Sequence, residues 1–221
     1  MAKVYLSPSD QESNVYAYDN TNEAVQCGRI AEACRAALER SGVEVKVGHM
    51  ISMAQKCSES NAFGADLHVP VHTNAFNGKV MGTRMFCYSA GGKGMAACKA
   101  IFARLAPITP GESENIQVNA DYYEVRVPAA PTAYIECEFH DTVEGAKWIV
   151  ENTVLIGETI ARGICDYFGV TFKEPEQPKP AAGATIYRVQ VGAYAKKENA
   201  ENMLAKLKKD GYSGFIVEGK L

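Results

Sequence analysis

The sequence lacks three features that would assign it to common classes of protein. It has no long apolar run, so we expect no membrane-spanning helix. Its 23 Lys and Arg against 26 Asp and Glu give a net charge of −3, which argues against nucleic acid as a partner because phosphate binding needs a basic surface. Its first residues, 1–7, lack the apolar core of a secretory signal peptide. We therefore expect synthesis in the cytoplasm without a signal peptide.

The seven cysteines include no CxxC pair, and their number is odd. They are spread along the chain and fall mostly on the apolar faces of expected helices and strands. This pattern is typical of reduced thiols that fill a core, and it argues against disulfides or a thiolate metal site.

Strands alternate with helices over residues 1–171. Apolar periodicity and turn residues predict helices over 22–40, 51–61, 95–105 and 143–167, with strands at 3–6, 43–47, 66–71, 83–88 and 132–138. Such alternation predicts an α/β fold of three layers, in which helices cover both faces of a mostly parallel sheet.

A Pro-rich, charged run follows the α/β region and predicts an interdomain linker over residues 172–185. Residues 186–221 then predict a small βαβ unit, with strands at 186–191 and 215–218 around a helix at 196–209. A unit this short seldom buries enough surface to fold alone. We therefore expect it to dock, to self-associate or to be half of a longer module.

Polar side chains occur where the expected strands end. His72 ends the third strand, Glu136 lies in the last strand, and Asp10 or Gln11 follows the first. Glu23 opens the first long helix and points back toward the same edge of the sheet. Ligands bind at the carboxyl ends of strands in such folds, and one histidine with carboxylates is the composition of a hydrolytic zinc site.

Each candidate has an alternative role. Asn20 and Glu23 have capping-box spacing, in which Glu23 would only bond the cap residue. His68 lies four residues before His72, about 13 Å away along a strand, and is expected to be a core histidine. Glu136 and Glu138 lie on one side of their strand, so a glycosidase using this carboxylate pair is a second class of enzyme.

The order of five motifs resembles the zinc-dependent N-acetylmuramoyl-L-alanine amidases of the type-3 family, which occur in bacterial autolysins and phage endolysins. The matching residues are Asn22-Glu23-Ala24, Asn61 with Gly64-Ala65-Asp66, Val71-His72-Thr73-Asn74-Ala75, Gly82-Thr83, and Pro131 to Phe139. The resemblance covers residues 1–171 and implies the same α/β fold.

By this resemblance, Glu23 and His72 are zinc ligands, and Glu136 is the general base that deprotonates the attacking water. The reaction would cleave the amide bond between N-acetylmuramic acid and L-alanine of the stem peptide. Asn74, which frames the site, and Glu138 are candidate substrate-binding residues. Bacterial peptidoglycan is the implied partner.

The chain departs from the family pattern at one ligand. The family places a histidine after the first strand in a Gly-His context, whereas residues 7–13 contain no histidine. Counting from the strand end puts Asp10 at this position, with Gln11 as the next choice. The expected consequences are weaker zinc binding, a different ion or no ion, and the alternative function is a catalytically impaired wall-binding protein.

The tail resembles the first half of a sporulation-related (SPOR) repeat, a module that binds peptidoglycan glycan strands. The matching residues are Tyr187 to Tyr194, Ala200 to Leu204 and Gly211-Tyr212. Together the two resemblances predict a lytic enzyme that acts at the bacterial cell wall. Without a signal peptide, a phage endolysin released through a lysis pore is expected, with a mother-cell lysin as the alternative.

Overall fold

The computed structural model describes residues 1–114, 116–175, 189–209, 212 and 214–219. The chain divides into two compact units, Met1–Pro175 and Glu176–Leu221. Among the described residues, no helix combines the length and the apolar character needed to cross a bilayer.

The first unit is built on a six-stranded sheet with the strand order β2-β1-β3-β6-β4-β5. β6 pairs antiparallel with β4, and every other neighbouring pair is parallel. The sheet therefore has the mostly parallel character that the sequence predicts. Its strands are β1 (Lys3–Pro8), β2 (Glu44–Val47), β3 (Leu67–Asn74), β4 (Arg84–Cys87), β5 (Gln117–Val118) and β6 (Tyr134–Phe139).

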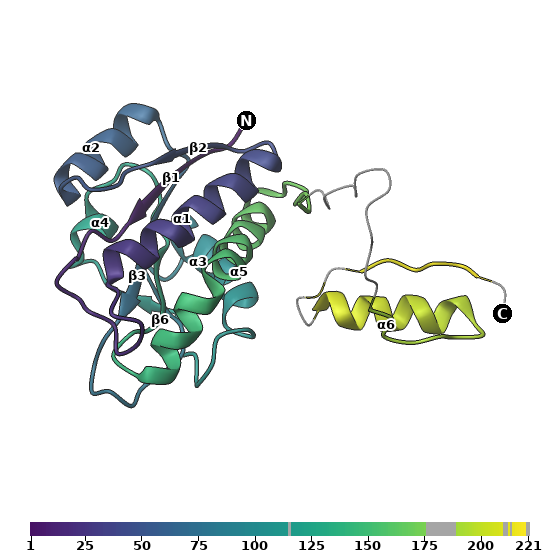
Figure 1. The fold of residues 1–221 in the computed structure, drawn as a ribbon. Helices are drawn as coiled ribbons and strands as arrows, with labels where there is room; N and C mark the ends of the chain where they lie inside the picture. The colour runs from purple at the N-terminus through teal and green to yellow at the C-terminus, as the bar shows by residue number, and fades with distance from the viewer. Residues whose placement is uncertain (115, 176–188, 210–211, 213, 220–221) are drawn as a thin grey trace, which may run out of the picture. The chain divides into compact units, whose positions relative to one another are not determined.

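Helices cover both sides of this sheet (Figure 1). One layer holds α1 (Glu23–Arg40), α3 (Lys93–Leu105) and α5 (Val143–Phe168), with α5 packed between the other two. The opposite layer holds α2 (Met53–Phe63) and the short α4 (Tyr123–Arg126), which contact each other. The three-layer α/β architecture is confirmed.

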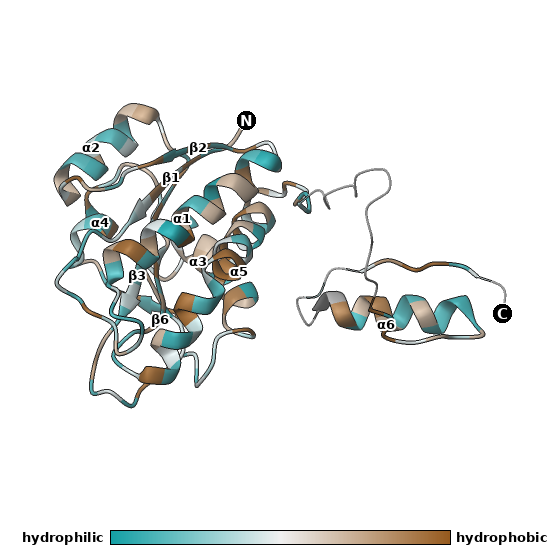
Figure 2. Cartoon of the chain, in the orientation of Figure 1, coloured by the Kyte–Doolittle hydropathy of each residue, from teal (hydrophilic) through white to brown (hydrophobic). Residues whose placement is uncertain are grey.

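The apolar core lies mainly between the sheet and the α1, α3 and α5 layer. Hydrophobic and hydrophilic residues alternate along these helices in Figure 2, as expected for helices with one buried face. Cys27, Ile30 and Cys34 form part of the buried face of α1. All seven cysteines are buried and free of disulfides, as predicted.

Gly157 allows α1 and α5 to approach each other closely. A β-carbon at this position would lie 2.5 Å from the carbonyl oxygen of Ile30 and 2.6 Å from Cβ of Ala33. Any larger side chain would push the two helices apart. This contact holds α1, and with it Glu23, in a fixed position on the sheet.

The first unit extends past residue 171, where we expected the linker to begin. The guanidinium groups of Arg162 and Arg40 lie 4.0 and 5.6 Å from the ring centroid of Phe172. The backbone N–H of Lys173 also donates to Oγ of Ser41 at 3.0 Å. These contacts hold residues 172–173 on the α/β unit. Residues 176–185 of the predicted linker lie outside the described part of the chain.

In the described part of the second unit there is one helix, α6 (Lys197–Lys209), which matches the predicted helix. No strand is assigned within residues 189–196 or within 212 and 214–219, so the predicted strand at 215–218 is not formed. The predicted strand at 186–191 lies partly outside the described residues. A strand requires a ladder of backbone hydrogen bonds to a neighbour, and an alternating sequence pattern alone does not supply that neighbour.

Candidate active site

His72 and Glu136 are direct neighbours in the parallel register of β3 and β6. Residues in register on neighbouring strands project to the same face of the sheet, so their side chains lie side by side. Each residue is only 8% exposed. The ring of Tyr134 stacks on the His72 imidazole with ring centroids 4.8 Å apart and an interplanar angle of 19°. The stacking fixes the plane of the imidazole.

Glu23 reaches this edge of the sheet from the first turn of α1. Its Oε1 lies 2.9 Å from Nδ1 of His72, and its Oε2 accepts a hydrogen bond from Nδ2 of Asn14 at 2.6 Å. The helix cap is Asn22, whose side chain accepts from the N–H of Val25. The capping-box alternative for Glu23 is therefore wrong.

The Glu23–His72 pair perturbs the pKa of both partners. Burial alone would raise the pKa of Glu23, but the hydrogen bond and charge of His72, together with bonds from Asn14 and Ser9, lower it. Burial alone would lower the pKa of His72, but the bond to Glu23 and the charges of Glu136 and Glu23 raise it. The result is a buried ion pair, 49 positions apart in the sequence.

The pKa of Glu136 is shifted upward, opposite to that of the other carboxyl, Glu23. Burial raises its pKa to about 8, with the His72 charge opposing the shift and the Glu23 charge adding to it. A carboxylate whose pKa lies near neutrality is suited to take up and return a proton. Such a perturbed group in a buried polar site is a typical catalytic candidate.

Two polar atoms at this site have no hydrogen-bond partner among the described residues. They are Nε2 of His72 and Oε2 of Glu136, and both are buried. A buried polar atom without a partner costs roughly 1–3 kcal/mol, so such atoms mark places where a ligand, ion or water belongs. The two atoms lie on neighbouring strands and on the same face.

The structure does not place Asp10 beside Glu23 and His72, where we expected it as a ligand. Its carboxylate lies 2.7 Å from Nζ of Lys56 and 3.3 Å from Nδ1 of His49. It also accepts hydrogen bonds from the backbone N–H groups of Met50 and Ile51, at 2.7 and 3.2 Å. These contacts bind the end of β1 to the start of α2, so both carboxylate oxygens are already used.

Gln11, the second choice, is linked to the site only indirectly. It is exposed, and its Oε1 accepts from Nδ2 of Asn14 at 3.1 Å. The same Asn14 nitrogen donates to Glu23. Gln11 therefore contacts the residue that holds Glu23 in place.

The two candidate substrate-binding residues differ in accessibility. Asn74 is half-buried at the end of β3, and its Oδ1 accepts from the N–H of Ala75. Glu138 is fully buried, and its Oε1 accepts from the N–H groups of Gly82 and Phe139 at 2.7 and 2.6 Å. Glu138 thus anchors the turn before β4, which disfavours both a direct substrate contact and the glycosidase alternative.

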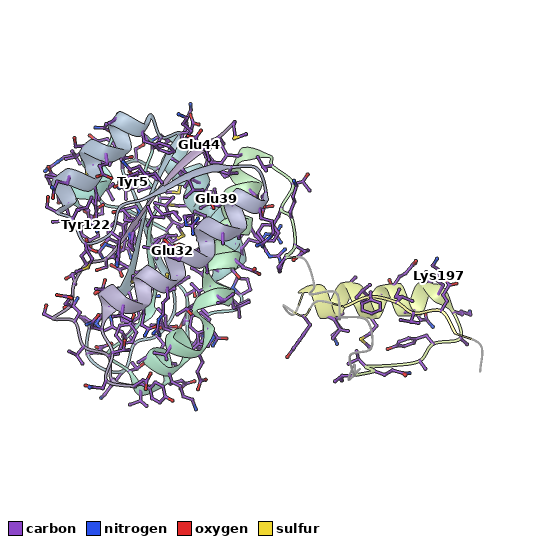
Figure 3. All side chains as sticks on the ribbon, turned by 45° about the horizontal axis from the view of Figure 1, so that its top comes forward. Tyr5, Glu32, Glu39, Glu44, Tyr122 and Lys197 are labelled. Carbon is purple, nitrogen blue, oxygen red and sulfur yellow. The ribbon has the colours of Figure 1, made fainter. Side chains whose placement is uncertain are left out.

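The sequence reasoning missed a second polar cluster on the α2 and α4 side of the sheet. Cys57, His68 and Glu124 are buried, and one potential ligand atom from each lies within 4.8 Å of the others. Glu124 lies in a four-residue helix that periodicity does not reveal. Tyr122, which precedes this helix, and Tyr5, which stacks on His68, are both labelled in Figure 3.

Two family models match the chain. The Amidase_3 model, N-acetylmuramoyl-L-alanine amidase, matches residues 9–166 and so covers more than half of the sequence. The SPOR domain model matches residues 169–218.

Two relatives are similar to this chain over nearly its whole length. The chain is 22% identical to the sporulation-specific N-acetylmuramoyl-L-alanine amidase of Bacillus subtilis, covering 98% of this chain and 85% of that protein. It is 23% identical, with the same coverage, to the N-acetylmuramoyl-L-alanine amidase CwlM of Bacillus licheniformis.

The fold matches a solved catalytic domain of the same kind. The N-acetylmuramoyl-L-alanine amidase CwlV of Bacillus (Paenibacillus) polymyxa var. colistinus superposes with a TM-score of 0.69 at 15% identity, over 77% of this chain and all of that domain. The resemblance inferred from the five motifs is thus confirmed at the level of the fold and the sequence family. The chain belongs to the Amidase_3 family of N-acetylmuramoyl-L-alanine amidases and carries a SPOR domain.

Proposed function

We propose that Glu23 and His72 hold a catalytic zinc ion and that Glu136 is the general base for cleavage of the bond between N-acetylmuramic acid and L-alanine. The observation that carries this proposal is the buried Glu23–His72 pair, whose unpartnered His72 Nε2 lies on the same face as the unpartnered Oε2 of Glu136. The Amidase_3 family is generally zinc-dependent.

The residues present fit a zinc ion in their chemistry. Imidazole and carboxylate are both zinc ligands, with bonds near 2 Å. The 2.9 Å contact between Glu23 Oε1 and His72 Nδ1 is a hydrogen bond, and a zinc ion held by both atoms would replace it with a donor separation of about 3.3 Å. When bound, zinc would supply Lewis-acid chemistry, lowering the pKa of water and polarising the substrate carbonyl.

The protein residues then have distinct roles. Glu136 takes a proton from the attacking water and returns it to the leaving amine of L-alanine. Tyr134 fixes the plane of the His72 ring by stacking. Asn14 holds Glu23 from its other oxygen.

The proposed site has two candidate ligands in contact, Glu23 and His72, rather than the three ligands of most catalytic zinc sites. Asp10 is engaged by Lys56 and two backbone N–H groups. Gln11 is the remaining candidate near Asn14 for a third ligand, and an amide oxygen is a weak one. We therefore expect zinc to bind this chain more weakly than it binds a three-ligand site.

The SPOR domain gives the enzyme a second contact with its substrate. Such a domain binds peptidoglycan, and we propose that it concentrates the amidase on the wall. Self-association of this unit and the endolysin route to the wall stay predictions. The similarity to a sporulation-specific amidase along 98% of the chain favours the mother-cell alternative.

The test is release of new L-alanine amino termini from purified peptidoglycan. We expect activity with the full chain, loss on treatment with EDTA, and recovery when zinc is added. Binding to the wall without release would contradict amidase activity, and activity unchanged by EDTA would contradict the zinc proposal. The Glu136→Gln protein separates the two steps, because it should bind the wall without cleaving it.

A further inference from the structure

The cluster of Cys57, His68 and Glu124 combines three elements that are distant in sequence. Cys57 comes from α2, His68 from β3 and Glu124 from α4. Their relative exposures are 2%, 0% and 2%, so all three side chains are withdrawn from water. Burial of a thiol, an imidazole and a carboxylate together is costly unless their polar atoms are satisfied.

Within the cluster, only one of the two ring nitrogens of His68 has a hydrogen-bond partner. Its Nε2 lies 3.3 Å from Oε1 of Glu124, and the same oxygen accepts from Oγ of Ser7. Its Nδ1 is buried and has no hydrogen-bond partner among the described residues. With Nε2 facing the carboxylate, the other ring nitrogen of His68 is the buried polar atom that still lacks a partner in the described part of the chain.

We propose that Cys57, His68 and Glu124 bind a divalent transition-metal ion, zinc by preference, at a site separate from the amidase centre. Thiolate, imidazole and carboxylate are the three donor types that zinc accepts in proteins. The site leaves one tetrahedral position for a water molecule. The cysteine pattern predicted no thiolate metal site, because its members come together only in the folded chain.

The distances suit this assignment. Tetrahedral zinc, with bonds of about 2.0–2.3 Å, places its donor atoms roughly 3.3–3.6 Å apart. The three donor atoms already lie within 4.8 Å of one another. Binding would therefore draw these donor atoms together by up to about 1.5 Å.

The site is distinct from the amidase centre. His68 and His72 are four residues apart on β3, about 13 Å along a strand. One ion cannot bind both, and the amidase candidates Glu23, His72 and Glu136 include no sulfur.

The proposed ion would stabilise one wall of the amidase centre. Glu124 lies in α4, two residues after Tyr122. The Tyr122 ring lies 5.2 Å from that of Tyr134, which in turn stacks on His72 at 4.8 Å. An ion on Glu124 would fix α4 relative to α2 and β3, and so hold these two aromatic rings in place.

Cobalt(II) tests the proposal in the full chain, because a thiolate ligand gives Co²⁺ an intense near-ultraviolet charge-transfer band. After chelator removes bound metal, we expect titration with Co²⁺ to produce this band. The band should be absent in Cys57→Ala. It should persist in Cys34→Ala, the matched control, since Cys34 is an equally buried cysteine with no histidine or carboxylate among the groups that shift its pKa.

Two further variants keep the test decisive. Glu124→Gln retains the thiol and should weaken Co²⁺ binding, followed at the band, by at least about tenfold. His72→Ala should retain the band while losing wall hydrolysis, which distinguishes failure at one site from failure at the other. Absence of the band in the unaltered chain, or its loss in Cys34→Ala as well as Cys57→Ala, would overturn the proposal. Equal Co²⁺ affinity in Glu124→Gln would also overturn it.

Discussion

The carboxylate of Glu23 lies 2.9 Å from Nδ1 of His72, and this contact joins the first turn of α1 to the end of β3. Both residues are buried, at 1% and 8% exposure. The contact places two zinc-ligand types side by side and next to Glu136, the strand neighbour of His72.

The Glu23–His72 pair predicts that, in the metal-free protein, replacing His72 alone lowers stability more than replacing both residues. His72→Ala leaves the Glu23 charge buried without its partner, which should lower the free energy of unfolding by about 3–5 kcal/mol. In the double variant with Glu23→Gln the buried charge is gone, so part of that loss should be recovered. Chemical denaturation of the unaltered protein, the two single variants and the double variant measures the coupling free energy between Glu23 and His72. Additive effects of the two substitutions would contradict a buried ion pair.

Glu136→Gln should lower the rate of amide cleavage by about 10²–10⁴-fold, because the amide cannot accept a proton from water. Wall binding should be unchanged, since the SPOR domain is intact. The control is Glu151→Gln, which removes an exposed carboxylate on α5 whose partner Lys147 is also exposed. Kinetics on purified peptidoglycan would show both results, and an active Glu136→Gln protein would exclude Glu136 as the base.

Asp10→Asn tests whether Asp10 is structural or a zinc ligand. The contacts of Asp10 with Lys56, whose side chain is 3% exposed, predict a loss of about 1–3 kcal/mol in stability. Zinc content and affinity should be unchanged. The opposite outcome, zinc lost with stability retained, would restore Asp10 as the third ligand.

Glu138 should make the stability of the metal-free protein depend on pH. Burial raises its pKa from 4.5 to about 7, outweighing the backbone hydrogen bonds from Phe139 and Gly82. A raised pKa means that the folded state favours the protonated acid, so its stabilising contribution is complete below about pH 4.5 and is lost as the pH rises through about 7.

Glu138→Gln mimics the protonated acid at every pH. Near pH 8 it should therefore be more stable than the unaltered protein by about 1–3 kcal/mol, and near pH 5 the difference should be small. Denaturation at the two pH values measures this, with Glu151→Gln as the control. A difference that is equal at both pH values would show that Glu138 is ionised in the fold throughout.

The sequence by itself determined the fold class and the order of elements. The spacing of apolar residues predicted the four long helices and the mostly parallel sheet, because this spacing shows which face of each element is buried. It also brought Glu23, His72 and Glu136 forward as candidates, since strand ends and helix starts meet at one edge of such a sheet. The tail strands were not formed in the described residues, because pairing depends on a neighbour that the pattern does not specify.

Only the tertiary structure decided which polar residues contact each other. Asp10 has the right position in the sequence for a ligand, yet the fold directs it to Lys56 and the start of α2. Cys57, His68 and Glu124 have no common motif, yet three elements bring them within 4.8 Å. Side-chain contacts across elements depend on how those elements pack, and a local pattern in the sequence does not encode that geometry.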